Sequence, residues 1–377
     1  MEDSLVIGID FGTTYSGVAW AYSRHPEIIQ TVANWEAEFR HCSDMDRTPT
    51  ALCYGSVNEA TTWGYAVPAD KVVARWFKLL LLDDKDVPEN VLKSPQFLEA
   101  RAFQSSTQKD PTEIIACFLK YLWNHSIDSI KREIEPELLE KCIFHVVITL
   151  PAIWPHYAQN RMRIAAEISG MLAERSCGET TLRFVSEPEA AALATITDLS
   201  KRSTIKASNI FAKGDTMVVC DAGGGTVDLI SYLVERIEPF QIKECVKGEG
   251  GLCGGVFVDA EFLKMVETKL GSVAWGGLSK AEKQKLLNDS WEHNIKSQFH
   301  GQDRSWFVEL PDTCQTPGGQ KRRRSLEFSS QEMASVFMPV TKKIEDLLQR
   351  QLTAIAAKHQ EDPKVFRPSM RLHSQVD

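Results

Sequence analysis

Two strand–turn–strand patterns constrain the fold of this chain more than any other feature. The clearer one covers residues 217–234, where an apolar run ends at Asp221, a glycine turn follows, and a second apolar run starts at once. The turn and the start of the returning run contain Gly223, Gly224, Gly225, Thr226 and Asp228. Because glycine lacks a Cβ and tolerates positive φ, backbone N–H groups in such a turn can converge on an anion. The pattern therefore predicts a hairpin whose turn suits phosphate.

The same pattern occurs near the N-terminus. The apolar run 5–10 ends in Asp10, and an alternating run starts at Ser16. The turn residues between them are Phe11, Gly12, Thr13, Thr14 and Tyr15. One such turn alone also fits an ordinary hairpin, since Asp, Gly and Thr favour turns for conformational reasons. Two copies in matched apolar runs instead predict an internal repeat with one nucleotide between its halves.

Length and charge limit the classes of function. The chain has 377 residues, which corresponds to about two domains of ~150 residues. Its formal charge of -8 argues against nonspecific nucleic-acid binding, which requires a basic surface. Residues 1–4 carry Glu2 and Asp3 and lack a basic signal-peptide region, and no apolar run approaches the ~20 residues of a membrane span. We expect a cytoplasmic or nuclear protein without a nucleic-acid or membrane partner.

The nine cysteines fit neither a disulfide framework nor a zinc site, because their spacing is irregular and no Cys-x-x-Cys pair occurs. Cys220 and Cys253 lie beside the proposed phosphate segments, so oxidation is one interpretation. Burial as small apolar residues is the interpretation that we favour.

Alternating helical and strand patterns predict an α/β fold. An apolar stripe at helical spacing follows Asp110-Pro111, and the continuous apolar run 143–150 is typical of a strand buried on both faces. A further strand, 182–186, delivers Glu187 to a helix start. Glu187 is either a ligand-side carboxylate at a strand's carboxyl end or a surface acid favoured by the helix dipole. Position alone leaves both interpretations open.

Three further segments have two interpretations each. Lys78 interrupts an aromatic and aliphatic cluster, where composition favours a lysine that extends its ammonium into water. The glycine cluster 247–255, which ends in Gly254 and Gly255, precedes a helical pattern, so it forms either an anion site at unpaired first-turn N–H groups or a flexible loop. The basic run 321–324 resembles a nuclear-import patch, but an exposed loop is favoured.

Taken together, the motifs resemble the nucleotide-binding domain of the heat-shock protein 70 chaperones, in the actin-like ATPase superfamily. The matching stretches are Ile9 to Ser16, Val147 to Ala152, Ser186 to Ala192, Asp221 to Asp228, and Leu252 to Gly255 with Phe257 and Asp259. The short motifs Trp63-Gly64 and Trp76-Phe77-Lys78-Leu79 resemble those of the divergent member-12-like branch of this family.

This resemblance implies a two-lobed actin-like ATPase fold, each lobe built on a ribonuclease-H-like mixed sheet with flanking helices. The first lobe would cover 1–200 and the second 201–377, with ATP or ADP and Mg²⁺ in the cleft. The family has an adenosine motif, a strand followed by Gly-Gly and a helix, that should begin near Val365. This chain reads Phe366-Arg367-Pro368-Ser369 there. We therefore expect an incomplete second lobe with weakened or lost nucleotide affinity.

The resemblance also implies roles for individual residues. Asp10 and Asp221 would hold a hydrated Mg²⁺, which prefers to keep waters and to use few carboxylates. Lys78 and Glu187 would orient the attacking water, with Asp228 as the acid of the second turn. Phosphate contacts would come from Gly12, Thr13, Thr14, Tyr15, Gly223, Gly224, Gly225, Thr226, Gly254 and Gly255. Glu292 and Lys296 would lie on an adenosine-side helix predicted over 279–299.

The expected function is ATP binding and hydrolysis by a chaperone-like protein, with client proteins or co-chaperones as possible partners. The alternative is a catalytically dead scaffold that binds a partner without nucleotide. A sugar or glycerol kinase of the same superfamily is a third candidate, against which the Ser186 to Ala190 stretch argues.

Overall fold

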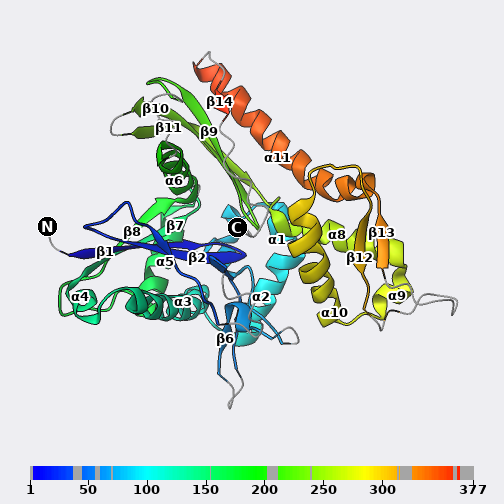
Figure 1. Cartoon of the computed structure of the whole chain (residues 1–377), viewed down its shortest axis with the longest axis horizontal. Helices are drawn as coiled ribbons and strands as arrows, with labels where there is room; N and C mark the ends of the chain where they lie inside the picture. Colours follow the sequence, from blue (N-terminus) through cyan, green and yellow to red (C-terminus); the bar gives the residue numbers. More distant parts are fainter. Residues whose placement is uncertain are drawn as a thin grey trace. The chain divides into compact units, whose positions relative to one another are not determined.

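The computed structural model describes residues 3–36, 45–55, 60–68, 71–152, 154–201, 211–237, 240–311, 314, 325–359 and 363–365. These residues form two compact units, Met1–Leu193 and Ala194–Asp377, shown in Figure 1. The predicted lobe boundary at residue 200 lies on a helix that starts in the first unit, α6 (Glu187–Lys201).

The first unit is built on a mixed sheet with strand order β3-β2-β1-β7-β8, with β4 paired to β2. Strand β1 is antiparallel to β2 and parallel to β7, which is parallel to β8. The strands are β1 (Ser4–Phe11), β2 (Tyr15–Tyr22), β3 (Gln30–Thr31), β4 (Arg47–Pro49), β7 (Ile143–Leu150) and β8 (Thr181–Ser186). A separate short hairpin consists of β5 (Leu52–Cys53) and β6 (Thr62–Trp63). The N-terminal strand–turn–strand prediction is thereby confirmed.

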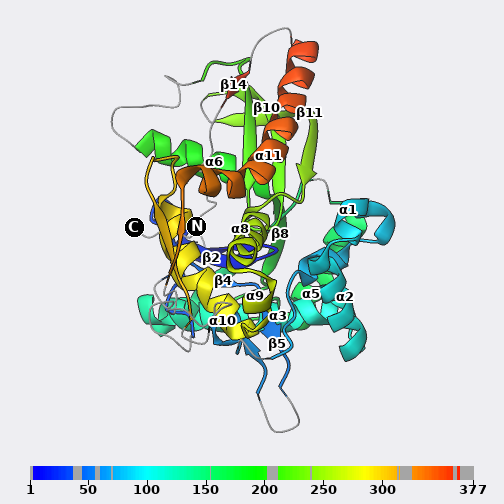
Figure 2. The ribbon, with the colours of Figure 1, turned by 90° about the vertical axis from the view of Figure 1, so that its right-hand side faces the viewer.

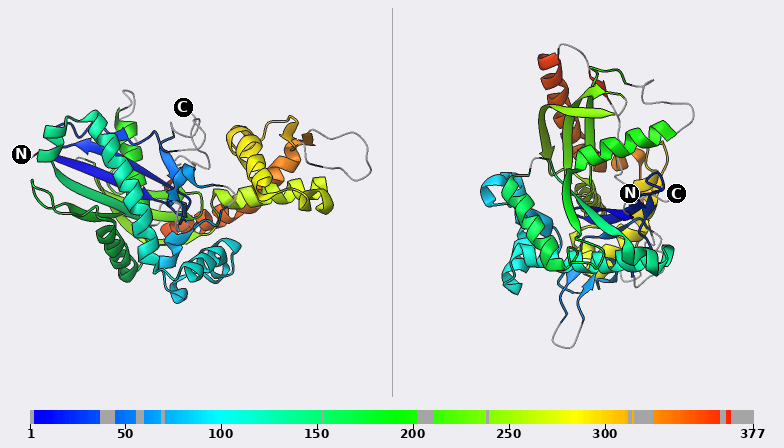
Figure 3. Two further views of the ribbon diagram at one scale, coloured as in Figure 1. Left: turned by 90° about the horizontal axis from the view of Figure 1, so that it is seen from below. Right: turned by 90° about the vertical axis from the view of Figure 1, so that its left-hand side faces the viewer.

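Two packed helices, α3 and α5, cover one face of this sheet (Figure 3). Helix α3 begins with a capping box at Asp110 and a proline at its first turn, which satisfy or remove amides that would lack partners. Its apolar stripe is buried, as the periodicity predicts. The α-helices are α1 (Glu89–Leu92), α2 (Pro95–Thr107), α3 (Pro111–Glu133), α4 (Pro136–Lys141) and α5 (His156–Ser169). The 3₁₀ helices are η2 (Gly64–Ala66), η3 (Phe77–Leu81) and η4 (Asp84–Asp86).

The second unit has a sheet with strand order β11-β10-β9-β14, and α11 runs along it (Figure 2). Its strands are β9 (Thr216–Ala222), β10 (Val227–Arg236), β11 (Gln241–Gly251) and β14 (Lys364–Val365), with a separate hairpin of β12 (Trp306–Glu309) and β13 (Ser325–Phe328). Its helices are α8 (Gly255–Leu270), α9 (Ser272–Gly276), α10 (Lys280–Lys285), the π-helix η5 (Leu286–Lys296) and α11 (Ser330–His359). The second strand–turn–strand prediction is thereby confirmed as well.

Two local predictions in this unit differ from the structure. The helix predicted over 279–299 begins at Ser279 with a capping box, but it continues as a π-helix after Lys285. The glycine-rich stretch 247–251 belongs to β11, because Gly250 pairs with Asp228 in register. A Cβ at Gly250 would lie 2.6 Å from Asp228 Oδ1, so glycine permits this strand to approach.

The C-terminal strand β14 pairs in parallel with β9 through Val365 and Val218, where a strand of the adenosine motif was expected. Residues 366–377, on which the expectation of a missing Gly-Gly and helix depends, lie outside the described residues, as does the basic run 321–324. Among the described helices, none is long and apolar enough to cross a bilayer.

Candidate functional site

The first turn, between β1 and β2, is held tightly by backbone and hydroxyl contacts. A Cβ at Gly12 would lie 2.2 Å from the carbonyl oxygen of Tyr15, so no other residue fits this backbone. Thr50 Oγ1 donates to the Gly12 carbonyl at 2.8 Å, and the Thr50 N–H donates to the Thr14 carbonyl at 2.7 Å. Thr13 is buried, while Tyr15 is 40% exposed. The turn therefore has one fixed backbone shape beside the end of β1.

Asp10 is the residue before the last one of β1, and its side chain is 38% exposed. Thr149 lies near the end of β7, which runs parallel to β1, and its Oγ1 donates to Asp10 Oδ1 at a distance of 3.3 Å. Arg47 Nη2 lies 3.1 Å from Asp10 Oδ2. Sequence reasoning assigned no role to Thr149 or Arg47. Thr149 lies within the matched stretch Val147 to Ala152, which could have pointed to it. No sequence pattern indicated Arg47.

Lys78 and Glu187 form a buried ion pair beside the same strand end. Lys78 Nζ lies 2.5 Å from Glu187 Oε1, and the two side chains are 2% and 12% exposed. The ammonium also lies 5.7 Å from the ring centroid of Phe11 and 5.5 Å from that of Trp154. The interpretation of Lys78 as a lysine extended into water is therefore wrong. The surface-acid interpretation of Glu187 is wrong too, because its carboxylate is enclosed with a cation.

Electrostatics tie these charged groups into one cluster within the first unit. Burial raises the pKa of the Glu187 carboxyl, and the Lys78 ammonium opposes that rise. The charge of Asp10 raises the pKa of Glu187 further, and the charge of Arg47 lowers it. The first unit thus brings together Asp10, Lys78 and Glu187, and it adds Arg47. Two carboxylates and two cations face each other at the end of β1.

The second turn, between β9 and β10, is bound by the start of α8. The N–H groups of Gly254, Gly255 and Val256 donate to the carbonyls of Gly225, Gly223 and Gly224 at 3.2, 3.1 and 2.9 Å. A Cβ at Gly254 would lie 2.5 Å from the Gly223 carbonyl oxygen. The expectation of unpaired first-turn amides at this helix is therefore wrong. The glycine pair instead allows one backbone to dock on another.

The two acids of the second hairpin lie opposite each other in the sheet. Asp221 of β9 pairs in register with Asp228 of β10, and Asp228 is buried. Burial, together with the charge of Asp221, raises the pKa of Cys220 to about 12, and burial raises the pKa of Cys253 to about 11. Both thiols stay protonated at neutral pH, which supports the interpretation of these cysteines as small packed residues.

Glu292 and Lys296 lie on the π-helix and form an ion-paired group with Asp259. Lys296 Nζ lies 2.9 Å from Asp259 Oδ1 and 2.7 Å from Glu292 Oε2, and its side chain is only 4% exposed. Burial by itself would lower the pKa of Lys296, but the two carboxylates outweigh it and raise that pKa. Trp291 Nε1 also donates to Asp259 Oδ1, at 2.7 Å. This group joins the π-helix to α8.

The described residues contain no group of three or more His, Cys, Asp or Glu side chains that could hold a metal ion. Magnesium is usually held through one or two carboxylates and several waters. The partly exposed carboxylate of Asp10, oriented by Thr149, fits that mode of binding. Asp221 belongs to the other unit.

Comparison with known proteins identifies relatives of this chain by sequence. The chain is 28% identical to human heat shock 70 kDa protein 12B over 315 residues, covering 70% of this chain and 44% of that protein. It is 27% identical to human heat shock 70 kDa protein 12A over 321 residues, covering 70% of this chain and 45% of that protein. The chain is a divergent relative of the heat shock 70 kDa proteins. No family model matches it.

A bacterial chaperone, the HscA homologue of Acinetobacter baumannii strain SDF, is 28% identical over 236 residues, or 60% of this chain and 32% of that protein. The chain thus spans less than half the length of these curated relatives. Its mixed sheets and helices are consistent with the actin-like ATPase fold of the heat shock 70 kDa proteins.

Proposed function

We propose that this chain binds Mg–ATP and hydrolyses it to ADP, as a chaperone-like ATPase. The observation that carries the proposal is the buried Lys78–Glu187 pair, which lies in one charged cluster with Asp10 beside a glycine turn. Similarity to heat shock 70 kDa proteins supports nucleotide binding. Client proteins or co-chaperones as partners, and a cytoplasmic or nuclear location, belong to the same proposal.

Phosphoryl transfer depends mainly on positioning and charge neutralisation, so it needs no covalent group from the protein. In our proposal Lys78 and Glu187 orient the attacking water, since a buried ammonium fixes the direction of the carboxylate. Asp10 and Asp221 would hold a hydrated Mg²⁺, which would supply positive charge to the phosphates when bound. The residues 12–15 and 223–226 bind phosphate oxygens through backbone N–H groups and hydroxyls, and Asp228 supports the second turn.

The remaining assignments follow the same division between the units. Gly254 and Gly255 bring α8 against the second phosphate turn, which fixes the shape of that turn. Glu292 and Lys296 are proposed to lie on the adenosine side, where the π-helix contacts α8 through Asp259.

Isothermal calorimetry with Mg–ATP tests this function directly. We expect binding heat from the folded protein. In Asp10→Asn we expect the affinity for Mg–ATP to fall at least about tenfold, because a ligand for the metal is weakened. Steady-state turnover should fall in Asp10→Asn and in Lys78→Met. Absence of heat from well-folded protein, or unchanged turnover in Asp10→Asn, would refute the proposal.

One observation favours the alternative of a scaffold that works without nucleotide. Arg47 already pairs with Asp10 Oδ2, the carboxylate that we assign to the metal, so the guanidinium competes with a cation there. Capture of a partner with equal affinity in the presence and absence of Mg–ATP, by a chain that shows no ATP heat, would establish the scaffold.

A further inference from the structure

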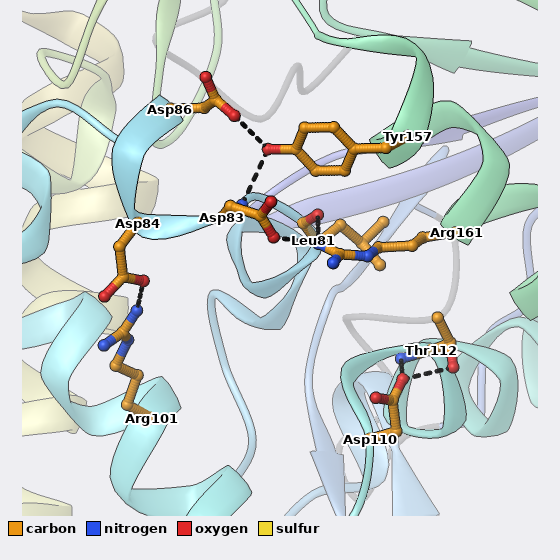
Figure 4. Close-up of polar contacts among 9 residues, drawn as sticks. All are labelled: Leu81, Asp83, Asp84, Asp86, Arg101, Asp110, Thr112, Tyr157 and Arg161. Carbon is orange, nitrogen blue, oxygen red and sulfur yellow. Dashed lines mark hydrogen bonds and ion pairs between the residues drawn. The ribbon is translucent and has the colours of Figure 1, made fainter.

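Two side chains of α5 bind the segment 76–86, which carries Lys78, at residues that follow Lys78 (Figure 4). Arg161 Nη1 donates to the carbonyl of Leu81 at 2.8 Å and lies 2.9 Å from Asp83 Oδ1. Tyr157 Oη accepts from the Asp83 N–H at 2.9 Å and donates to Asp86 Oδ2 at 2.5 Å. Arg161 thus binds the backbone at the last residue of η3, three residues after Lys78.

The other end of the segment is held in an unusual backbone conformation. Trp76, just before η3, has φ 61° in the left-handed region, which costs a bulky residue free energy unless its surroundings enforce it. The start of α5 also lies near the ammonium, because Trp154, two residues before His156, contacts Lys78. Trp154 and helix α5 therefore contact this part of the chain at Lys78 and again between Leu81 and Asp86.

A cavity of about 410 Å³ adjoins the segment on the side of Leu80, Leu82 and Asp83. The side chains of η3 are buried, and the polar contacts from α5 add to this packing where the cavity interrupts it. Its charged groups are already engaged, since Arg161 pairs with Asp83, Arg101 pairs with Asp84, and Asp110 caps α3. The cavity for this reason gives no sign of a ligand.

The Arg161–Asp83 pair contributes little to global stability. Its side chains are 39% and 41% exposed, and ion pairs with that exposure are screened by solvent. The hydrogen bond to the Leu81 carbonyl has a different effect, since it fixes the position of the backbone that carries Lys78.

We propose that Arg161 and Tyr157 are positioning residues, which hold η3 so that Lys78 Nζ stays on the carboxylate of Glu187. The catalytic consequence rests on the proposed function, in which Lys78 and Glu187 orient water. The geometric part does not depend on ATP hydrolysis.

Lysine labelling tests the geometric part without any measurement of activity. Reductive methylation followed by peptide mass spectrometry measures how often Lys78, which is 2% exposed, becomes accessible. In Arg161→Gln we expect Lys78 to be methylated about tenfold faster, the effect of losing one charged hydrogen bond. Arg161→Lys keeps the charge but not the two-pronged geometry, so it should restore protection only in part.

Arg101→Gln is the matched control. Arg101 lines the same cavity, has a similar exposure of 40%, and pairs with the side chain of Asp84 next to the segment. We expect unchanged Lys78 labelling in this variant. Equal labelling in Arg161→Gln and wild type, or an equal rise in Arg101→Gln, would overturn the proposal. Should Arg161→Gln fail to fold, Tyr157→Phe removes only a hydroxyl and is judged by the same labelling criterion.

ATP turnover tests the catalytic part. In Arg161→Gln we expect kcat to fall about tenfold with KM nearly unchanged, because the lost contact affects the water-orienting pair and not nucleotide binding. A wild type that hydrolyses no ATP refutes the proposed function, yet the labelling result still decides the positioning. Normal wild-type turnover with unchanged labelling and kcat in Arg161→Gln would refute the positioning alone.

Discussion

At the scale of single residues, the pKa of the Glu187 carboxyl is set by two opposing effects. Burial raises the pKa of its carboxyl above the ordinary value of 4.5, and the Lys78 ammonium lowers it. A group whose pKa is raised in the folded state stabilises the fold at pH values below the unfolded pKa, and this stabilisation is lost as pH rises through the folded pKa. The Lys78 charge lowers the free-energy cost of ionising the buried Glu187.

Lys78→Met should therefore raise the pKa of Glu187 further, because the opposing positive charge is gone while burial remains. Carbon-detected NMR titration of the carboxyl measures the midpoint directly. Glu189, on the same helix start, has an exposed side chain and provides an internal reference. A midpoint that stays in place or moves to lower pH in Lys78→Met would contradict this account.

Sequence analysis assigned functional roles to three of the four charged residues in the cluster at the end of β1, namely Asp10, Lys78 and Glu187. Asp10 and Glu187 follow apolar runs whose carboxyl ends meet at one edge of a sheet, and this position is visible in the pattern. Arg47 lies in a turn-rich stretch without periodicity, and it reaches Asp10 only because β4 pairs with β2. The burial of Lys78 was equally hidden, since local composition does not reveal a carboxylate 109 residues away in sequence.

At the scale of elements, the docking of α8 on the second turn predicts a strict requirement for glycine. Gly254→Ala would place a Cβ 2.5 Å from the Gly223 carbonyl oxygen and 2.6 Å from the Gly224 carbonyl carbon. We expect urea denaturation to show a loss of about 2 kcal/mol or more in the free energy of unfolding, as overpacked sites do.

Gly276→Ala is the control for this prediction. Gly276 ends α9, and a Cβ there would meet no atom within 4 Å, so its replacement should leave stability unchanged or slightly raised. Similar losses in both variants would mean that the close approach at Gly254 has no energetic importance.

Periodicity was sufficient for the regular elements and failed where tertiary contacts decide the backbone. The apolar stripes and runs of α3 and β7 were evident in the sequence. The π-helix was not, because its residues bury the same apolar side chains that an α-helix would present, Trp291 and Ile295 among them. The end of β11 resembled a glycine loop because the reason for Gly250 lies in Asp228 of another strand.

At the scale of the whole molecule, our proposal requires the phosphate turns of both units to bind nucleotide. Hydrogen–deuterium exchange tests this requirement, since bound Mg–ATP should slow exchange in residues 12–15 and in residues 223–226. A ligand at 100 times its Kd stabilises the bound state by about 2.7 kcal/mol, which is ample for detection. The β12–β13 hairpin is the internal control and should exchange at the same rate with and without nucleotide.

Asp10→Asn should reduce the protection of both turns together. Protection confined to one turn would contradict the assignment of phosphate binding to both turns, although it would leave nucleotide binding by that single unit intact.

The fastening of α8 has a mechanical consequence. Its first residues are joined to the second turn by three main-chain hydrogen bonds, and the helix continues for 16 residues as a rod roughly 24 Å long. A small rotation of the turn therefore becomes a larger displacement at Leu270, because the distance moved grows along the rod. If the second turn binds a terminal phosphate as we propose, loss of that phosphate would displace the far end of α8.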